Sequence, residues 1–248
     1  MPYNIIVLIK QIVDIDLLKV DSSTGTPQVQ GLPLRLENLS KNAVEEAVRI
    51  KEKHGGKITA ICFGTEKSTS AMKEAYAMGV DEGYILTGYT GNNPSLTADV
   101  ISKKIGEIPH DIIILGNQSA ESYTGMLQGK LSSILEEPLL SDAVKVEINE
   151  RSATVTMALE NENIVAKAQM PVIISVTQEI NDPRFPPVMQ IMTAGRKKIN
   201  IEAAQFSPDD KIEVLSNTAP RSERKKTVFE DQEKGITEIA KVIREGMK

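Results

Sequence analysis

The residues best placed for chemistry in this sequence are small and polar ones that directly follow apolar runs. At Gly116 an apolar run gives way to a polar segment that enters a predicted helix near Thr124. Small residues at a helix start leave backbone N–H groups accessible, and the positive end of the helix dipole favours phosphate. The hydroxyl groups of Ser119, Ser122 and Thr124 are candidate donors. The pattern predicts either a phosphate site or an ordinary helix cap, and the residues alone leave both open.

Three other apolar runs end in similar positions, at Lys10-Gln11, Phe63-Gly64-Thr65 and Gly88. Ligands of an open α/β sheet bind beyond the carboxyl ends of its strands, so these positions belong to the same predicted site. Familiar nucleotide signatures are missing from the sequence, which has neither a G-x-G-x-x-G segment after the first run nor a Walker A segment. A Ser/Gly-rich loop is also missing after the first run, where the sequence reads KQIVDID. The sequence therefore favours holding a nucleotide over hydrolysing one.

Candidate catalytic residues are sparse. His54 and His110 lack the serine or cysteine and acid neighbours of a catalytic triad. Cys62 lies within an apolar run and is expected to be a small core residue. No residues have metal-ligand spacing. We therefore predict no catalytic residue and no metal site, and an electron carrier rather than a catalyst by itself.

The composition excludes several classes of protein. The chain has 248 residues, a net charge of −5 and one cysteine, which disfavours nucleic-acid binding and excludes an internal disulfide framework. The first residues, MPYNIIVLIK, hold too short an apolar run for a signal peptide, and no run reaches the length of a membrane span. We expect a cytoplasmic protein.

Strand and helix patterns alternate four times in the first part of the chain. Such alternation predicts an α/β fold, Rossmann-like or adenine nucleotide α-hydrolase-like, in which helices flank a parallel sheet. Either Ser40 or Asn42 is expected to cap the first helix. The predicted strands are residues 5–9, 57–64, 81–88 and 111–116, and the predicted helices are residues 40–54, 67–79, 95–108 and 121–135.

The pattern changes after the fourth helix. Four short runs between residues 143 and 179 predict an appended antiparallel meander. Residues 201–227 are polar and rich in turn formers, so we interpret them as an extended linker. A terminal helix with Ile236, Ile239, Ala240, Ile243 and Met247 on one side either clamps a partner or packs on its own domain. These features predict a nucleotide-binding domain at 1–200 and a C-terminal arm at 201–248.

A proline-rich segment precedes the linker. Pro183, Pro186 and Pro187 fix their own φ angles and lack backbone donors, which predicts a stiff loop. Apolar residues follow at once from Val188 to Met192, and a basic run follows them. A soluble protein does not usually display such side chains on a loop without a partner for them.

These segments resemble the β subunit of electron transfer flavoprotein nearly from end to end. The resemblance is carried by the Lys-Gln pair after the first strand, by KEAYAMGVDEGYIL, by IILGNQSAESYT, and above all by residues 160–199. It implies a heterodimer with an α subunit that holds the redox FAD, to which β lends one wall. It also implies a nucleotide buried in β, either AMP or a second FAD that meets NADH in electron-bifurcating members.

The resemblance implies the residues of the nucleotide pocket. The family usually has Asn-Pro where Glu37-Asn38 stands here, and a second acidic residue where Tyr123 stands, so the identity of the nucleotide stays open. The implied residues are Leu8, Lys10, Glu37, Asn38, Leu39, Ser40, Phe63, Gly64, Gly116, Asn117, Gln118, Ser119, Glu121, Ser122, Tyr123, Thr124, Gly125, Met126 and Leu127.

The resemblance also gives the proline-rich segment a role. In the family, the loop matching residues 184–192 docks an apolar side chain into a pocket on a partner flavin dehydrogenase, and Val188 occupies that position here. The alternative is that Val188 to Met192 pack under the α subunit. Any membrane contact is expected only through a partner quinone reductase. The implied docking residues are Arg184, Pro187, Val188, Met189, Ile191, Arg196, Lys197 and Lys198.

Two further functions fit the residues taken alone. One is a stand-alone adenine-nucleotide-binding enzyme of related fold, against which the missing Ser/Gly-rich loop argues. The other is an interaction module with an empty pocket. Co-purification with a yellow partner, turnover of ATP, or a colourless nucleotide-free monomer would separate the three functions.

Overall fold

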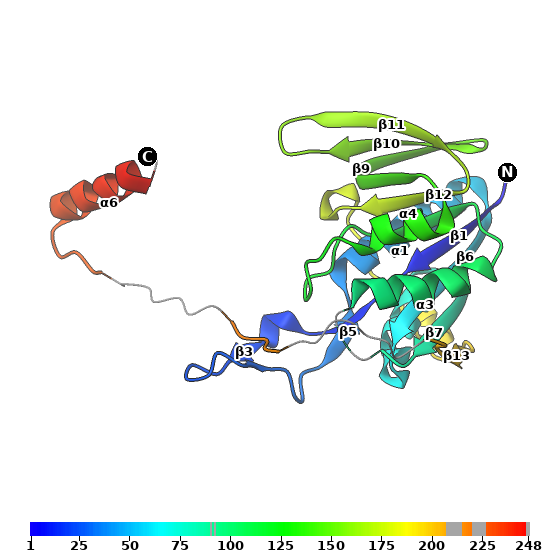
Figure 1. Cartoon of the computed structure of the whole chain (residues 1–248), viewed down its shortest axis with the longest axis horizontal. Coiled ribbons are helices and arrows are strands. Elements are labelled where there is room, and N and C mark those ends of the chain that lie inside the picture. Colours follow the sequence, from blue (N-terminus) through cyan, green and yellow to red (C-terminus); the bar gives the residue numbers. More distant parts are fainter. Residues whose placement is uncertain (90, 92, 207–214, 220–226, 247–248) are drawn as a thin grey trace. The chain divides into compact units, whose positions relative to one another are not determined.

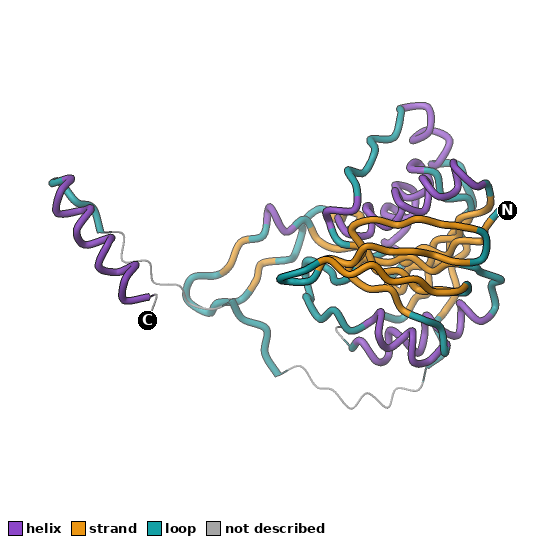
Figure 2. The backbone as a smooth tube through the Cα atoms, turned by 90° about the horizontal axis from the view of Figure 1, so that it is seen from above, coloured by secondary structure: helices purple, strands orange, loops and turns teal. Residues whose placement is uncertain are grey.

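A computed structural model of the chain describes residues 1–89, 91, 93–206, 215–219 and 227–246. They form a larger unit, residues 1–18 and 29–215, and a smaller unit, residues 19–28 and 216–248. The larger unit is an α/β fold in which helices lie on both faces of a sheet (Figures 1 and 2), and this confirms the predicted fold class.

The sheet of the larger unit has nine strands in the order β11-β10-β9-β12-β8-β1-β6-β7-β13. All neighbours pair in parallel except β9 with β10 and β10 with β11. The strands are β1 (Tyr3–Leu8), β6 (Gly56–Gly64), β7 (Glu82–Thr87), β8 (Ile112–Gly116), β9 (Leu139–Asn149), β10 (Ser152–Ala158), β11 (Asn163–Gln169), β12 (Val172–Val176) and β13 (Asn200–Ala203).

Two helical layers bury the two faces of this sheet. The alternate residues Ile5 and Val7 of β1 pack with α1 and α2, while Ile6 and Leu8 pack with α3 and α4. Alternation sends successive side chains to opposite faces, so a strand covered on both faces is apolar throughout. The helices are α1 (Asn38–His54), α2 (Thr69–Met78), α3 (Pro94–Gly106), α4 (Leu127–Leu135) and α5 (Val188–Ala194).

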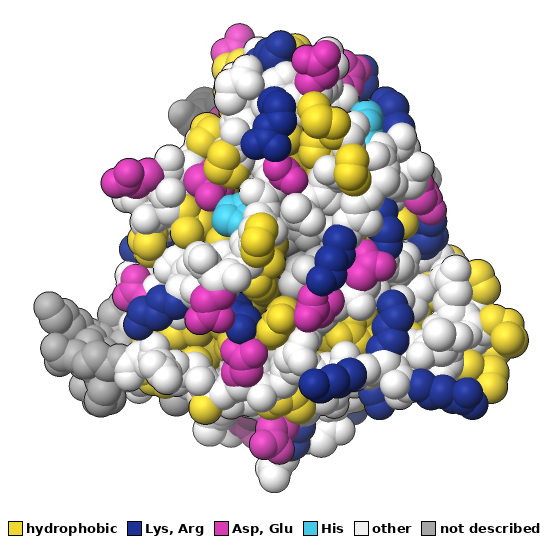
Figure 3. All heavy atoms as spheres, turned by 90° about the vertical axis from the view of Figure 1, so that its right-hand side faces the viewer, with side chains coloured by type: hydrophobic (Ala, Val, Ile, Leu, Met, Phe, Trp, Pro, Cys, Tyr) yellow, Lys and Arg dark blue, Asp and Glu magenta, His cyan; other side chains and the backbone are white. Residues whose placement is uncertain are grey.

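Short elements complete the two units. The larger unit has a two-stranded sheet of β2 (Gln11–Val13) and β5 (Leu34–Leu36), and 3-10 turns η1 (Ile15–Leu17), η2 (Glu66–Ser68) and η3 (Gln178–Ile180). The smaller unit has the hairpin of β3 (Lys19–Val20) and β4 (Pro27–Gln28), and the helix α6 (Gln232–Gly246). Charged side chains of both signs are interspersed on the face drawn in Figure 3.

The structure corrects the predicted meander. Only β9, β10 and β11 are antiparallel neighbours, whereas β12 returns between β8 and β9 and pairs in parallel with both. All five residues of β12 are buried. A run buried on both faces is typical of a parallel strand inside a sheet, and a meander strand with one solvated face would alternate instead.

The linker predicted from Ile201 is also wrong in its first residues. Asn200–Ala203 form the edge strand β13, which pairs in parallel with β7. Glu202 of β13 ties this strand to α3, because its carboxylate accepts a hydrogen bond from Lys104 Nζ at 2.7 Å. Residues 207–214 and 220–226 of the predicted linker lie outside the described residues.

His110 ties the start of β8 to the end of α4. Its Nδ1 lies 2.9 Å from the carbonyl oxygen of Ile108, and its Nε2 lies 2.8 Å from Glu137 Oε1. Both neighbours are hydrogen-bond acceptors, so they favour the protonated imidazolium, in which both ring nitrogens are donors. Burial works against this charge, but the hydrogen bonds to Glu137 and Ile108 outweigh it, and the pKa of His110 is raised.

The raised pKa of His110 predicts a loss of stability with rising pH. The contribution of His110 is fully present below the pKa of an unfolded histidine, about 6.5, and is lost as pH rises through the folded-state pKa. We expect His110→Gln to lower the free energy of unfolding by about 1–3 kcal/mol at pH 6 and by less at pH 9. Denaturant unfolding at both pH values measures this.

His54 is the matched control, because its pKa is lowered, chiefly by burial and then by Lys53. Its contribution to stability is present at high pH and is lost as pH falls, so His54→Gln should change the pH dependence in the opposite sense. An equal effect of His110→Gln at both pH values would contradict a charged His110.

Candidate functional site

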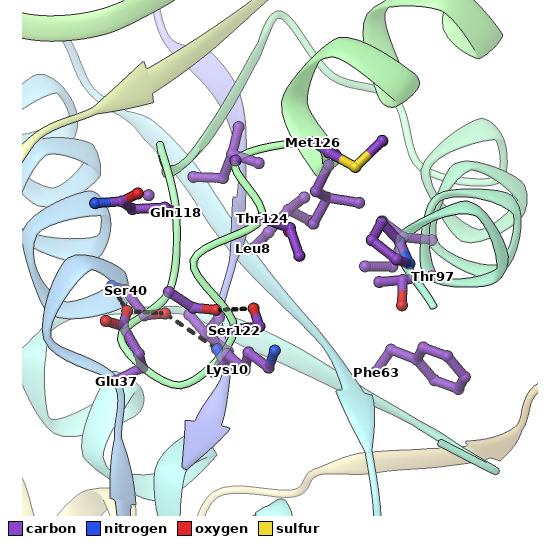
Figure 4. Close-up of a pocket in the computed structure, with 18 of the residues that line it drawn as sticks. Leu8, Lys10, Glu37, Ser40, Phe63, Thr97, Gln118, Ser122, Thr124 and Met126 are labelled. Carbon is purple, nitrogen blue, oxygen red and sulfur yellow. Dashed lines mark hydrogen bonds between the residues drawn. The ribbon is translucent and has the colours of Figure 1, made fainter. Parts of the chain in front are cut away.

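A pocket lies at the carboxyl edge of the sheet, where β1 and β8 end (Figure 4). The strand order reverses here, since β6 lies on one side of β1 and β8 on the other. Ligands of open α/β sheets bind in the crevice at such a reversal. The empty space of the pocket, including its open mouth, is about 820 Å³.

Most of the implied nucleotide residues come together at this pocket. Leu39 lies beneath it, where a side chain on Gly116 would come within 2.6 Å of Leu39 Cβ. Asn38, Leu39, Gly64, Glu121 and Tyr123 are not among the lining residues. The implied residues that line the pocket are Leu8, Lys10, Glu37, Ser40, Phe63, Gly116, Asn117, Gln118, Ser119, Ser122, Thr124, Gly125, Met126 and Leu127.

One wall of the pocket was missed by the sequence reasoning. It comes from the start of α3 and the turn before it, and Figure 4 shows Thr97 with Phe63 on the side of the space opposite Ser40 and Ser122. The signal was the Asn93-Pro94 pair, since Asn93 caps α3 by accepting from Ser95 N at 3.0 Å. The missed lining residues are Ile9, Tyr89, Asn93, Pro94, Thr97, Ile101 and Leu115.

Aromatic rings gather at this wall. The ring centroids of Phe63 and Tyr89 are 5.3 Å apart, and those of Phe63 and Phe206 are 6.3 Å apart, both with edge-to-face geometry. The chain has only nine tyrosine and phenylalanine residues, so three rings in one cluster make an apolar surface suited to a planar ring of a ligand.

The polar segment after β8 forms the opposite wall. Ser122 N and Tyr123 N both donate to the carbonyl oxygen of Ser119, which makes a tight turn. Tyr123 and Gly125 have φ angles of 50° and 59°, in the left-handed region. The helix predicted over residues 121–135 therefore begins only at Leu127, because left-handed residues cannot continue a right-handed helix.

The cap predicted for the first helix is also different. Glu37 caps α1, and its Oε2 accepts from Ser40 N at 2.7 Å. Ser40 Oγ instead accepts from Lys10 N at 3.1 Å. These bonds join the start of α1 to the end of β1, so that both line the pocket.

Lys10 is the sole lysine or arginine among the described lining residues of the pocket, and Glu37 is the acidic residue among them. The ammonium group of Lys10 pairs with Glu121 and lies 5.8 Å from the centroid of the Tyr89 ring. Burial raises the pKa of the Tyr89 hydroxyl, and Lys10 opposes that shift. The arrangement offers one cation beside an apolar wall and a turn that carries the Ser119, Ser122 and Thr124 hydroxyl groups, which suits an anionic group on a planar ligand.

Among the described residues that line the pocket there is no cysteine and no histidine. Burial raises the pKa of the Cys62 thiol to about 11, so Cys62 is an unreactive core residue. Among residues 1–89, 91, 93–206, 215–219 and 227–246, no three His, Cys, Asp or Glu side chains gather in a metal-binding arrangement.

Comparison with known proteins shows the family. The sequence model of the electron transfer flavoprotein domain matches residues 28–207. The chain is 34% identical over 238 residues to an electron transfer flavoprotein subunit beta from Thermoanaerobacterium thermosaccharolyticum, covering 91% of this chain and 92% of that protein. The chain belongs to the electron transfer flavoprotein family.

Two further relatives extend this comparison. A Clostridium acetobutylicum electron transfer flavoprotein subunit beta is 28% identical over 234 residues, covering 94% of this chain and 90% of that protein. The Caffeyl-CoA reductase-Etf complex subunit CarD of Acetobacterium woodii is 28% identical over 202 residues, covering 80% and 77%. These matches confirm the resemblance to the electron transfer flavoprotein family that the sequence showed. Membership of this family gives the chain a role in electron transfer.

In this electron transfer flavoprotein chain, the predicted stiff loop at 184–192 is partly helical. The prolines precede α5, and Pro187 is its N-cap residue with a φ angle of −60°. Proline is tolerated at a helix start because the N–H that it lacks would have no helical partner. On α5, Val188 and Met189 are each 72% exposed. Phe185, which was not predicted, is 97% exposed, and Ile191 and Met192 are exposed too.

The four basic residues of the predicted docking set lie in different surroundings. Lys197 Nζ donates to the carbonyl oxygen of Val80 at 2.9 Å, and the carbonyl oxygen of Lys198 accepts from the Tyr76 hydroxyl at 2.8 Å. The side chain of Arg196 is exposed. Arg184 pairs with two carboxylates of α1.

The terminal helix carries an exposed apolar stripe. Ile236, Ile239 and Ile243 of α6 are between 55% and 61% exposed, and Ala240 is half-buried. Met247 of the predicted stripe lies outside the described residues. Within the described part of the chain, no helix is both long and apolar enough to cross a membrane.

Proposed function

We propose that this chain is the β subunit of a heterodimeric electron transfer flavoprotein. In this proposal its pocket buries an adenine nucleotide, either AMP or a second FAD. The chain also lends a wall to the FAD of the α subunit and docks a flavin dehydrogenase through α5. The observation that carries the proposal is the pocket at the strand-order reversal, which combines an aromatic wall, a single lysine and the turn at residues 119–125.

The phosphate of the nucleotide is assigned to the end of the pocket near Lys10. N–H groups of the turn and the Ser119 and Thr124 hydroxyls are its neutral donors, and the Lys10 ammonium group supplies charge. The base or flavin ring is assigned to the aromatic wall, against Phe63 and Tyr89.

The arm and the terminal helix are proposed to hold the α subunit. The exposed apolar stripe of α6 supports this role, because three large aliphatic side chains in a row are the usual anchor of a helix on a partner. The arm in this proposal is the part of the chain that follows β13.

Lys10 and Glu121 give the proposal a direct test. A phosphate that binds Lys10 competes with the Glu121 carboxylate, which holds Lys10 in the ligand-free chain. Both side chains are partly exposed, so the competition is modest. We expect Glu121→Gln to tighten AMP binding by roughly three- to tenfold, and Lys10→Met to weaken AMP binding by roughly tenfold or more. Calorimetric titration of the nucleotide-free chain measures both.

Adenosine is the matched control ligand, because it lacks the phosphate and should bind the three proteins alike. Weaker AMP binding by Glu121→Gln would contradict the assignment, since it would show that the carboxylate itself holds the ligand. Absence of binding by AMP and FAD to the unsubstituted chain would contradict the nucleotide-pocket proposal as a whole.

A further inference from the structure

Helix α1 buries a row of polar side chains that the nucleotide pocket does not use. Asn42, Glu45 and Glu46 are 3%, 2% and 7% exposed. Burying a carboxylate is unfavourable unless charged or hydrogen-bonding partners compensate for the lost hydration. Arg49 of α1 itself donates to Glu45 Oε1 at 2.7 Å, and the other partners come from the segment that leads into α5.

The first contact is a reciprocal pair of asparagines. Asn42 Nδ2 donates to the carbonyl oxygen of Asn181 at 2.8 Å, and Asn181 Nδ2 donates to the carbonyl oxygen of Asn42 at 3.1 Å. Asn181 Nδ2 also lies 3.1 Å from Glu46 Oε2. Asn181 is 9% exposed, so the pair is sealed from water on both sides.

The second contact is a forked ion pair. Arg184 Nε donates to Glu45 Oε2 at 2.8 Å, and its Nη2 donates to both Glu45 Oε1 at 3.1 Å and Glu52 Oε2 at 3.0 Å. The backbone N–H of Arg184 also donates to Glu45 Oε2 at 3.2 Å. Burial opposes the charge of Glu45, but the Arg184 and Arg49 hydrogen bonds outweigh it and lower the Glu45 pKa.

We propose that Glu45 is a positioning residue for the docking segment, which we define as residues 181–198. Pro183, Pro186 and Pro187 supply no N–H groups to hold this segment. Helix α5 has seven residues, too few to be stable alone. The Glu45–Arg184 pair therefore fixes the segment before α5, as Tyr76 and Val80 fix it after α5. This inference rests on the docking role given to α5 under the proposed function.

The same helix forms part of the pocket. The first turn of α1 carries Glu37 and Ser40, which line the nucleotide pocket, and the next turns carry Asn42, Glu45 and Glu52. One rigid element thus sets the spacing between the pocket and the docking segment. A partner that binds α5 is thereby held at a defined distance from the bound nucleotide.

Hydrogen exchange of the full-length chain tests the anchoring without any partner. The Glu45→Gln substitution removes the charge that holds Arg184. It should raise the exchange rates of the α5 amides by about tenfold, while the exchange rates of the β1 and β6 amides stay unchanged. Glu52→Gln is the matched control, since the Glu52 side chain is 57% exposed and such a pair contributes little. If the Glu45→Gln protein does not fold, Arg184→Lys is used in its place. The Arg184 side chain is 34% exposed, and lysine keeps its positive charge. Lysine cannot, however, donate to two carboxylates at once as the arginine does.

A second measurement separates this inference from the proposed function. In the assembled flavoprotein, Glu45→Gln should raise the dehydrogenase concentration needed for half-maximal reduction, with the rate at saturation unchanged. The probe is a purified flavin dehydrogenase that reduces the parent protein. Unchanged α5 exchange in both variants would overturn the positioning role of Glu45. Faster α5 exchange with unchanged dehydrogenase dependence would uphold the anchor and overturn the docking role of α5.

Discussion

Gly125→Val is expected to empty the nucleotide pocket. Gly125 lines the pocket and has a φ angle of 59°, which costs a non-glycine residue roughly 1–2 kcal/mol. Valine is disfavoured further because its Cβ is branched. Relaxing this strain turns the N–H groups of the 119–125 turn away from the phosphate, so nucleotide binding should weaken by about tenfold or more. Loss of a ligand that binds only the folded state should also lower the melting temperature by roughly 5–10 °C.

Gly129→Ala is the control for this substitution. Gly129 lies within α4, and no atom would come within 4 Å of its added Cβ. Alanine there should keep the nucleotide and stabilise the chain by about 0.5–1 kcal/mol, because alanine is the better helix former. The nucleotide content of each purified protein, measured after denaturation, decides the outcome. Equal contents in the parent and Gly125→Val would remove the turn from the site.

Val188→Ala is expected to weaken docking of the dehydrogenase. Val188 is 72% exposed at the first turn of α5, and an apolar side chain that enters a partner pocket contributes about 1–3 kcal/mol. The loss corresponds to roughly a 5- to 150-fold weaker complex, mainly through faster dissociation. Stopped-flow reduction of the assembled flavoprotein at limiting dehydrogenase measures the change.

Two comparisons isolate this effect. Val165→Ala makes the same change at a valine that is 67% exposed on β11 and should leave electron uptake unchanged. Neutralising Arg196 and Lys198 should instead slow association, chiefly at low ionic strength, because exposed charges steer encounter and are screened by salt. Lys197 is left intact, since it holds the carbonyl oxygen of Val80. A Val188→Ala protein that accepts electrons as fast as the parent would return α5 to the subunit interface.

Continuous apolar runs made the central strands predictable. Residues such as Ile5–Ile9 and Ile112–Leu115 are buried on both faces of the sheet, so their pattern leaves little choice of element. The parallel pairing of β12 was readable from its apolar residues Val172–Ile174, but the preceding turns suggested a meander. The edge strand β13 is short and largely exposed, so no apolar pattern marks it.

The pocket was predictable on one side only. The glycine and hydroxyl residues after β8 mark their wall in the sequence, whereas Tyr89 and Thr97 join the pocket only because α3 folds back over the same edge of the sheet. The late start of α4 depends on the left-handed conformation of Tyr123, which its residue type does not reveal. The role of Glu45 was equally hidden, since its partner Arg184 lies 139 residues further along the chain.

Identification of the bound nucleotide tests the account most directly. The chain is purified together with its α subunit, the complex is denatured, and the released small molecules are identified by mass spectrometry and counted per heterodimer. The account predicts the FAD of the α subunit and one further adenine nucleotide, AMP or a second FAD, with the further nucleotide missing from the Gly125→Val complex. A complex that releases only the FAD of the α subunit, in the parent as well as in the variant, would contradict it.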